Sequence, residues 1–397
     1  MWFPLEGGIT APQGFQASGI ASGLKSSGRP DLALILAPEH ASCAGTFTTS
    51  VVRAACVDLC LERLQATGGR TRAVLINSGQ ANACTGDRGL IDSKRATQAL
   101  AHQLGQSADA IMMCSTGVIG VPIPMQTLLA GLNPLVAALS HSGGGAAANA
   151  ILTTDLVHKE VAVQANLSGR IVRIGGMAKG SGMIHPNMAT MLAFFSCDAG
   201  VDPSVWRAMV ARSVQRSFNA ITVDGDTSTN DTVLAFAAGS SLAIEHHATL
   251  ELGLTQVMQH LAKAIARDGE GATCLMEVQV EGAVDEASAL SVARTVCGSS
   301  LVKTAVHGRD PNWGRIVAAV GRANVAFDPE ALELWIGPHQ LMDRGQPLMF
   351  DRSAASDALR QDTVQIRLSL GSGVGQGYAW GCDLSEQYVD INAHYTT

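Results

Sequence analysis

One stretch of the chain, Gly176 to Phe195, combines residue types that could perform nucleophilic chemistry. Its glycines permit backbone conformations that other residues rarely adopt, so this loop can approach a ligand closely. Lys179 places a positive charge among the glycines, and Thr190 stands at the entrance to an apolar run, Met191 to Phe195, that is typical of a buried strand. A threonine held between such a loop and such a strand is a candidate nucleophile.

The chemistry that suits Thr190 requires a break in the chain. If the bond between Ala189 and Thr190 is cleaved, Thr190 gains a free α-amino group. The reference pKa of this group is about 7.7–8.0, so a good fraction of it is neutral near physiological pH. The amine can then take the proton of the threonine hydroxyl, as in enzymes that pair a threonine nucleophile with an N-terminal amine. The alternative is that Thr190 only begins a strand, where a β-branched residue is common.

The composition of the chain indicates a large buried core and disfavours several kinds of partner. Of 397 residues, 47% are apolar and 15% are charged, against about 25% charged in typical domains. The formal net charge of -7 argues against binding to nucleic acid or an anionic membrane. No run approaches the roughly 18 apolar residues of a membrane span, and the opening MWFPLEGG lacks the parts of a secretory signal. We therefore expect a cytoplasmic protein.

Cysteine, histidine and aspartate spacing predicts no metal site. The nine cysteines contain no CxxC pair, and they are interpreted as reduced thiols of a cytosolic protein. The eleven histidines contain no HExxH spacing. The acidic string DGDTSTND, Asp224 to Asp231, resembles a metal-binding loop but does not fit the calcium-binding EF-hand pattern. Its alternative interpretation is a turn-rich entry to the next element.

Strand and helix patterns both occur along the chain, and some strands are joined by hairpins. We expect this mixture to form an α+β or layered architecture rather than a strictly parallel sheet. The clearest predictions are strands in 31–38 and 72–86, a hairpin with its turn at 167–170, helices over 203–219 and 250–267, an apolar helix after residue 231, and a strand-like C-terminal segment, YVDINAHYTT.

Further loops carry polar groups that could bind a reacting molecule. In STGVIG, Ser115 to Gly120, consecutive N–H groups and a threonine hydroxyl could stabilise the oxyanion of an acyl transfer, or form a plain turn. TTD, Thr153 to Asp155, offers hydroxyls and a carboxylate, or a helix N-cap. Lys179 could bind a carboxylate, or be a solvated loop lysine. Glu270 in DGEGAT could bind an amine, or belong to a helix-terminating turn.

The string KGSGMIHPNMATML, Lys179 to Leu192, resembles the signature of the ornithine acetyltransferases, the ArgJ family of arginine biosynthesis. The similarity extends from APQGF near the start to the last threonine. It implies a layered α-β-β-α sandwich like that of the DmpA and ArgJ proteins, autoprocessed into two chains that stay together. Cleavage would then produce an alpha chain, 1–189, with the oxyanion loop, and a beta chain, 190–397, with Thr190 at its N-terminus.

The resemblance also implies roles for individual residues. Thr116 and Gly117 match the Thr-Gly pair that forms the family's oxyanion hole, and Ala189 and Thr190 match the cleavage site. The family's substrate-binding positions fall on Thr154, Lys179, Thr190, Glu270, Asn392 and Thr397. The family shares the DGDTSTND string without depending on a metal, so no metal is expected. The segment RDPNWGRI, Arg309 to Ile316, also matches and is interpreted as structural.

The implied activity is transfer of an acetyl group from N2-acetylornithine to glutamate through an acetyl-Thr190 intermediate, with ping-pong kinetics. No cofactor is expected, and the sequence leaves open whether acetyl-CoA also serves as an acetyl donor. The implied assembly is a heterotetramer of two alpha and two beta chains. Departures from the family pattern are Gln80 for an asparagine, His307 for an aromatic residue, and Thr396 for an arginine.

Two other activities remain as alternatives from the sequence. The first is an acyl hydrolase or aminopeptidase of the same fold, in which water replaces glutamate. The second is a nucleotide-binding kinase that uses GMAKGSG as a phosphate loop. Against the kinase, the chain has no GxxxxGK[ST] motif and no GxGxxG after a strand. A non-enzymatic scaffold is the simplest alternative of all.

Overall fold

The computed structural model describes residues 1–185 and 191–394. In this part of the chain the strands form three sheets. Sheet A has the strand order β1-β7-β8-β9-β11-β4, sheet B the order β2-β3-β5-β6, and sheet C the order β10-β17-β12-β16-β13-β14-β15.

The strands of sheet A are β1 (Phe3–Leu5), β4 (Ser42–Phe47), β7 (Lys159–Leu167), β8 (Arg170–Lys179), β9 (Leu192–Cys197) and β11 (Thr232–Ala237). Those of sheet B are β2 (Gln16–Ile20), β3 (Leu32–Leu36), β5 (Ala73–Gln80) and β6 (Ile111–Val118). Those of sheet C are β10 (Ile221–Thr222), β12 (Leu275–Ala283), β13 (Glu333–Ile336), β14 (His339–Asp343), β15 (Gln346–Pro347), β16 (Thr363–Ser369) and β17 (Gly375–Cys382).

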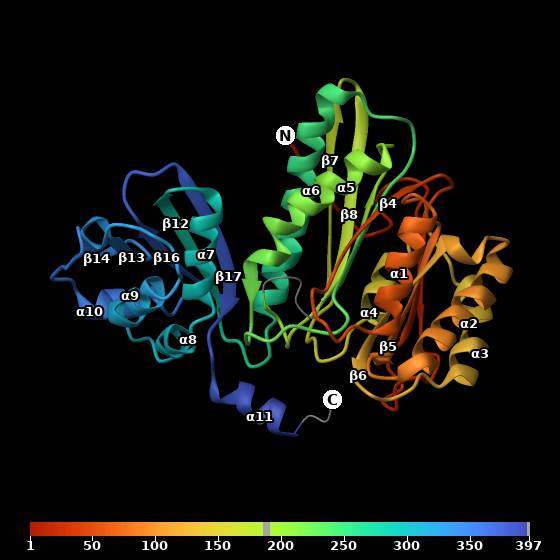
Figure 1. Ribbon diagram of the computed structural model, residues 1–397, viewed down its shortest axis with the longest axis horizontal. Coiled ribbons are helices and arrows are strands. Elements are labelled where there is room, and N and C mark those ends of the chain that lie inside the picture. The colour runs from red at the N-terminus through yellow and green to blue at the C-terminus, as the bar shows by residue number, and fades with distance from the viewer. Residues whose placement is uncertain (186–190, 395–397) are drawn as a thin grey trace.

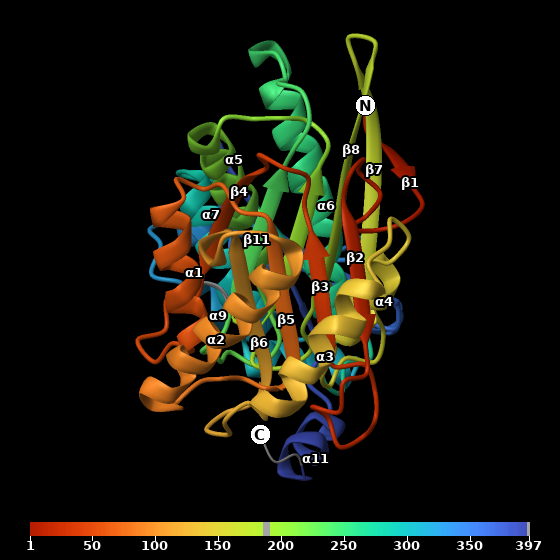
Figure 2. The same ribbon diagram turned by 90° about the vertical axis from the view of Figure 1, so that its right-hand side faces the viewer.

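Most of the helices lie on the outer faces of these sheets (Figures 1 and 2). The bounds of the helices are α1 (Ala55–Ala66), α2 (Gly86–Leu104), α3 (Met125–Ala137), α4 (Gly144–Ala150), α5 (Pro203–Gln215), α6 (His247–Arg267), α7 (Glu286–Cys297), α8 (Ser300–His307), α9 (Trp313–Gly321), α10 (Arg352–Ala358) and α11 (Glu386–His394). Helix α4 joins the core between sheets A and B, and α11 lies apart. None of the helices in the described ranges is long and apolar enough to cross a membrane.

Sheets A and B pack face to face and form the middle of a four-layer sandwich. Side chains on alternate positions of β9 point to opposite faces, as the period of a strand requires. Phe194 joins the core shared with sheet B, and Phe195 joins the core shared with α5 and α6. Helices α2 and α3 cover the other face of sheet B. The order helix, sheet, sheet, helix confirms the predicted α-β-β-α architecture.

Sheet C is a further layer, which the sequence analysis did not predict as a unit distinct from the sandwich. Its core is formed with α7, α8 and α9. Helix α6 packs on β7 and β8 of sheet A and also contacts β12 and β17 of sheet C, so it links the two parts (Figure 1). The loop that follows α6 therefore begins where the sandwich and sheet C meet.

Two of the sequence predictions for local structure are wrong. The apolar run after residue 231 forms strand β11, not a helix, because all its side chains are buried between layers and it pairs with both β9 and β4. The C-terminal segment that was expected to be a strand instead forms most of helix α11 and belongs to none of the three sheets. The hairpin at 167–170 is confirmed, since β7 and β8 pair antiparallel through Leu167 and Arg170.

Phe194 tests how much the contact between sheets A and B contributes to stability. Its side chain is fully buried, so Phe194→Ala should lower the free energy of unfolding by about 3–5 kcal/mol through lost burial and a cavity. Thermal and denaturant unfolding measure the change. Phe3→Ala is the matched control, because Phe3 is 56% exposed and its loss should cost no more than about 0.5 kcal/mol. Equal losses would show that the sheets do not depend on this contact.

Candidate functional site

Lys179 and Thr116, which are 63 positions apart in the sequence, lie together where sheets A and B end. Lys179 is the last residue of β8, and Thr116 lies near the end of β6. Lys179 Nζ donates to Thr153 Oγ1 at 2.7 Å and lies 3.5 Å from Thr116 Oγ1. The lysine is only 3% exposed, so the alternative of a solvated loop lysine is wrong.

Gly117 occupies a backbone position that only glycine can fill. Its φ is +129°, and a Cβ built there would lie 2.3 Å from the carbonyl carbon of Gly79. The close approach comes from parallel pairing of β5 with β6, where the register shifts at Gly79 and Gln80. The predicted oxyanion pair, Thr116 and Gly117, therefore sits on a rigid strand end rather than on a free loop.

A chain of alternating buried charges holds Lys179 in place. Lys179 Nζ lies 3.7 Å from Asp155 Oδ2, and Lys159 Nζ contacts Asp155 Oδ1 at 2.9 Å and Asp268 Oδ2 at 2.6 Å. The side chains of Asp155 and Lys159 are at most 1% exposed. Asp155 also accepts the N–H of Gly180 at 2.6 Å. These four charges join three separate segments into one unit.

The pKa values of these buried charged groups follow from their burial and their pairing. Burial alone would raise the pKa of Asp155, but Lys179 and Lys159 outweigh it and hold that pKa well below its usual range. Burial lowers the pKa of Lys179, whereas Asp155, Glu270 and Asp231 oppose this and favour the protonated amine.

The alternative interpretation of Thr153 to Asp155 as a helix N-cap is wrong, because the next element is strand β7 and Asp155 pairs with lysines instead.

Thr154 and Glu270 meet the glycine loop that follows Lys179. Thr154 Oγ1 lies 2.7 Å from Ser181 Oγ, and the N–H of Glu270 donates to Ser181 O at 2.8 Å. Gly182 packs so closely that a Cβ there would lie 2.5 Å from Glu270 Oε2. Asn392 on α11 donates from Nδ2 to Glu270 Oε2 at 3.0 Å. The structure thus brings Thr154, Lys179, Glu270 and Asn392 into one region.

The string DGDTSTND binds backbone groups on either side of the predicted cleavage site. Asp224 accepts the N–H groups of Met183 at 2.5 Å and Ile184 at 2.9 Å. Asp231 Oδ1 accepts the N–H of Met191 at 3.0 Å, and its Oδ2 has no hydrogen-bond partner among the described residues. Burial raises the pKa of Asp231 well above its usual range. The two carboxylates therefore hold the chain rather than forming an EF-hand.

Three predicted residues, Ala189, Thr190 and Thr397, lie outside the described residues. The sequence reasoning also missed several supporting residues, namely Lys159, Ser181, Asp231 and Asp268. A signal existed for Lys159, because Asp155 and Lys159 are four residues apart in DLVHK. Asp231 ends the DGDTSTND string that the sequence singled out, but no local signal indicated the partners of Asp231 or Asp268, since packing brings these partners to them.

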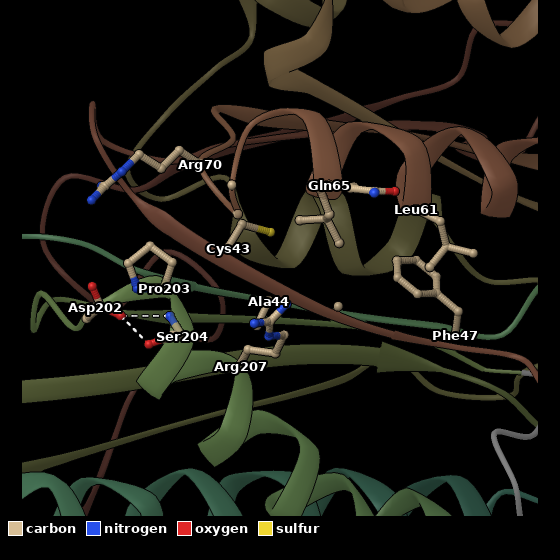
Figure 3. Close-up of a pocket in the computed structure, with 14 residues that line it drawn as sticks. Cys43, Ala44, Phe47, Leu61, Gln65, Arg70, Asp202, Pro203, Ser204 and Arg207 are labelled. Atoms are coloured by element: carbon tan, nitrogen blue, oxygen red, sulfur yellow. Dashed lines mark hydrogen bonds between the residues drawn. The ribbon is translucent and has the colours of Figure 1, made fainter.

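A cavity of about 660 Å³ lies elsewhere, between β4, α1 and the start of α5 (Figure 3). Its labelled walls include Phe47, Leu61 and Gln65 on one side and Asp202 and Arg207 on the other. Among the residues that the structure describes, none of the predicted site residues lines it. This cavity is therefore separate from the candidate site, and its volume does not identify that site.

The chain matches known proteins along almost its whole length. The model of the ArgJ family matches residues 16–397. The arginine biosynthesis bifunctional protein ArgJ of Parasynechococcus marenigrum is 77% identical, with coverage of 100% of this chain and 97% of the relative. The protein of that name from Prochlorococcus marinus strain MIT 9313 is 68% identical, with coverage of 100% and 95%.

Two solved structures are also similar. The ArgJ protein of Bacillus halodurans is 41% identical, with a TM-score of 0.49 over 50% of this chain and 97% of that chain. The ornithine acetyltransferase of Mycobacterium tuberculosis, solved in complex with ornithine, is 42% identical, with a TM-score of 0.44 over 47% of this chain and 98% of that chain.

Lys159 is the residue on which the buried charges depend. Lys159→Met should leave Asp155 and Asp268 without their shared cation and cost about 3–5 kcal/mol in the free energy of unfolding. The matched control is Lys263→Met, which breaks the part-exposed pair with Glu277 and should cost less than about 1 kcal/mol. Thermal unfolding of both variants measures the difference. Equal costs would contradict a central role for Lys159.

Proposed function

The chain belongs to the ArgJ family, and we propose that it transfers an acetyl group from N2-acetylornithine to glutamate in the cytoplasm, with Thr190 as the nucleophile. One observation carries this proposal. A buried ammonium, Lys179, lies 3.5 Å from the hydroxyl of Thr116, while Glu270 is held to the same glycine loop through Ser181. A cation for an α-carboxylate and an anion for a side-chain amine thus flank a candidate oxyanion site.

The first half-reaction cleaves the amide of the donor. Thr190 Oγ attacks the acetyl carbonyl carbon as its proton passes to the α-amine of Thr190. Thr116 and Gly117 donate to the oxyanion of the tetrahedral intermediate. The C–N bond then breaks, ornithine leaves with the proton on its amine, and an acetyl ester remains on Thr190.

The second half-reaction reverses these steps with another acceptor. The amine of glutamate attacks the ester carbonyl carbon, the same donors hold the oxyanion, and the proton returns to Thr190 Oγ. Lys179 is placed to bind the α-carboxylate that both substrates share, and Thr154, Asn392 and Thr397 complete the proposed substrate contacts. Neither half-reaction changes an oxidation state, so the proposed route needs no redox cofactor. We also propose acetyl-CoA as a second donor, because the relatives are named bifunctional.

Self-cleavage between Ala189 and Thr190 would divide the chain into residues 1–189 and 190–397. The topology of sheet A supports two products that stay associated. Strand β9 from the second part pairs with β8 from the first, and β11 pairs with β4. Separation of the products would break ladders on both sides of the pair β9 and β11. The proposed assembly is a heterotetramer of two such pairs.

Purification of the wild-type chain and of Thr190→Val tests the cleavage and the nucleophile together. The wild type should give fragments of 189 and 208 residues on a denaturing gel, whereas the variant should remain at full length without activity, because valine lacks the hydroxyl. Initial rates over both substrates should give parallel reciprocal plots. Intersecting plots, or full activity of an uncleaved chain, would exclude the mechanism. Acetate release without glutamate would instead support the hydrolase.

Asp231 offers a separate test of how the cleavage site is held. Asp231→Ala removes the acceptor for the N–H of Met191, and an unpaired buried N–H costs about 1–3 kcal/mol, so cleavage should slow by about 10- to 100-fold. Asp231→Asn should cleave faster than the alanine variant, because burial favours the neutral carboxyl and asparagine keeps an acceptor.

A time course of precursor disappearance on gels measures these rates. The control is Asp226→Asn, an exposed position in the same loop, which should cleave like the wild type. Equal rates for the alanine and asparagine variants of Asp231 would show that the backbone acceptor does not matter.

A further inference from the structure

The C-terminal segment leaves sheet C and reaches the loop that carries Glu270. After β17 ends at Cys382, Ser385 Oγ donates to Gly271 O at 2.6 Å, and Asn392 on α11 donates to Glu270 Oε2 at 3.0 Å. Helix α11 lies apart from the three sheets (Figure 1). Its position beside Glu270 therefore depends on a small number of polar contacts.

His307, the last residue of α8, lies between two carboxylates of this segment. Its Nδ1 is 2.7 Å from Asp383 Oδ2, and its Nε2 is 3.3 Å from Glu386 Oε2. The first contact is a hydrogen bond in which the ring donates to Asp383, since a carboxylate oxygen can only accept. The second contact places Glu386 within ion-pair distance of Nε2.

Asp383 connects the histidine to the other side of the Glu270 loop. Its Oδ1 accepts the N–H groups of Thr273 at 2.7 Å and Cys274 at 3.1 Å, and its Oδ2 accepts Thr273 Oγ1 at 2.7 Å. The loop between Asp268 and Thr273 is thus anchored at one end by Lys159 and at the other by Asp383. His307 joins this second anchor to the first turn of α11.

Charged groups of the C-terminal segment and of α8 surround His307. Burial opposes ionisation of Asp383, but hydrogen bonds from Thr273 and His307 hold its pKa below the usual range. A backbone hydrogen bond and the charge of His307 also lower the pKa of Glu386. On α8 itself, Lys303 turns its ammonium to the carbonyl oxygen of Cys382 rather than to the ring.

We propose that His307 is a positioning residue whose ring fastens α11 to the Glu270 loop and so sets the affinity for the amine end of the substrate. This inference rests on the proposed function, in which Glu270 and Asn392 bind that end. Loss of this fastening should raise KM for N2-acetylornithine and affect kcat little.

Steady-state kinetics of wild type, His307→Phe and Glu386→Ala test the proposal. Phenylalanine keeps a planar ring without donors. KM of His307→Phe should exceed that of the wild type by about tenfold, the effect expected from losing the hydrogen bond to the buried carboxylate of Asp383. Glu386→Ala should raise KM less, because Glu386 is 94% exposed. His102→Phe, at an exposed position on α2, should leave KM unchanged.

Hydrogen exchange separates this inference from the proposed function, because it requires no turnover. The amides of residues 386–394 should exchange faster in His307→Phe and Glu386→Ala than in the wild type. If the wild type transfers no acetyl group, the proposed function fails while the exchange result still stands. An unchanged KM of His307→Phe, or unchanged exchange in α11, would overturn the role of His307.

Discussion

The candidate site depends on one buried array of charges, Lys179, Asp155, Lys159 and Asp268. A single charge of this kind would be too costly to bury, but each carboxylate here faces a lysine and each lysine faces a carboxylate. The array joins the end of β8, the loop before β7 and the loop after α6. It therefore fixes the separation of Lys179 and Glu270, the two groups proposed to bind opposite ends of the substrate.

Strand pairing explains how a protein of this kind could be cut without falling apart. The two sides of the proposed cut contribute neighbouring strands to sheet A, and Phe194 and Phe195 of β9 enter two different cores. A break before residue 190 would remove one peptide bond but none of these contacts. The new N-terminus would then precede β9, an interior strand of sheet A, and a nucleophile attached to a rigid element loses little entropy on positioning.

Three acidic residues bind backbone N–H groups of the loops around the candidate site. Asp224 and Asp231 hold residues on either side of the predicted cut, and Asp383 holds the loop that carries Glu270. Such contacts satisfy donors that have no partner in a helix or sheet. The loops of the candidate site consequently have defined positions although they lack regular secondary structure.

The sequence by itself indicated a layered architecture, through the family resemblance carried by one long motif, and it named candidate site residues, because motifs and apolar runs are local properties. It indicated Thr116, Gly117, Lys179 and Glu270 as functional candidates, and the structure places these residues around the same strand ends. Only the tertiary structure decided that residues 232–237 form a strand and that α11 is a helix, since their neighbours lie far away in the chain. It also decided the partners of Lys159, Asp231 and His307. Most of these partners lie far away in the sequence, so only the complete fold brings them into contact.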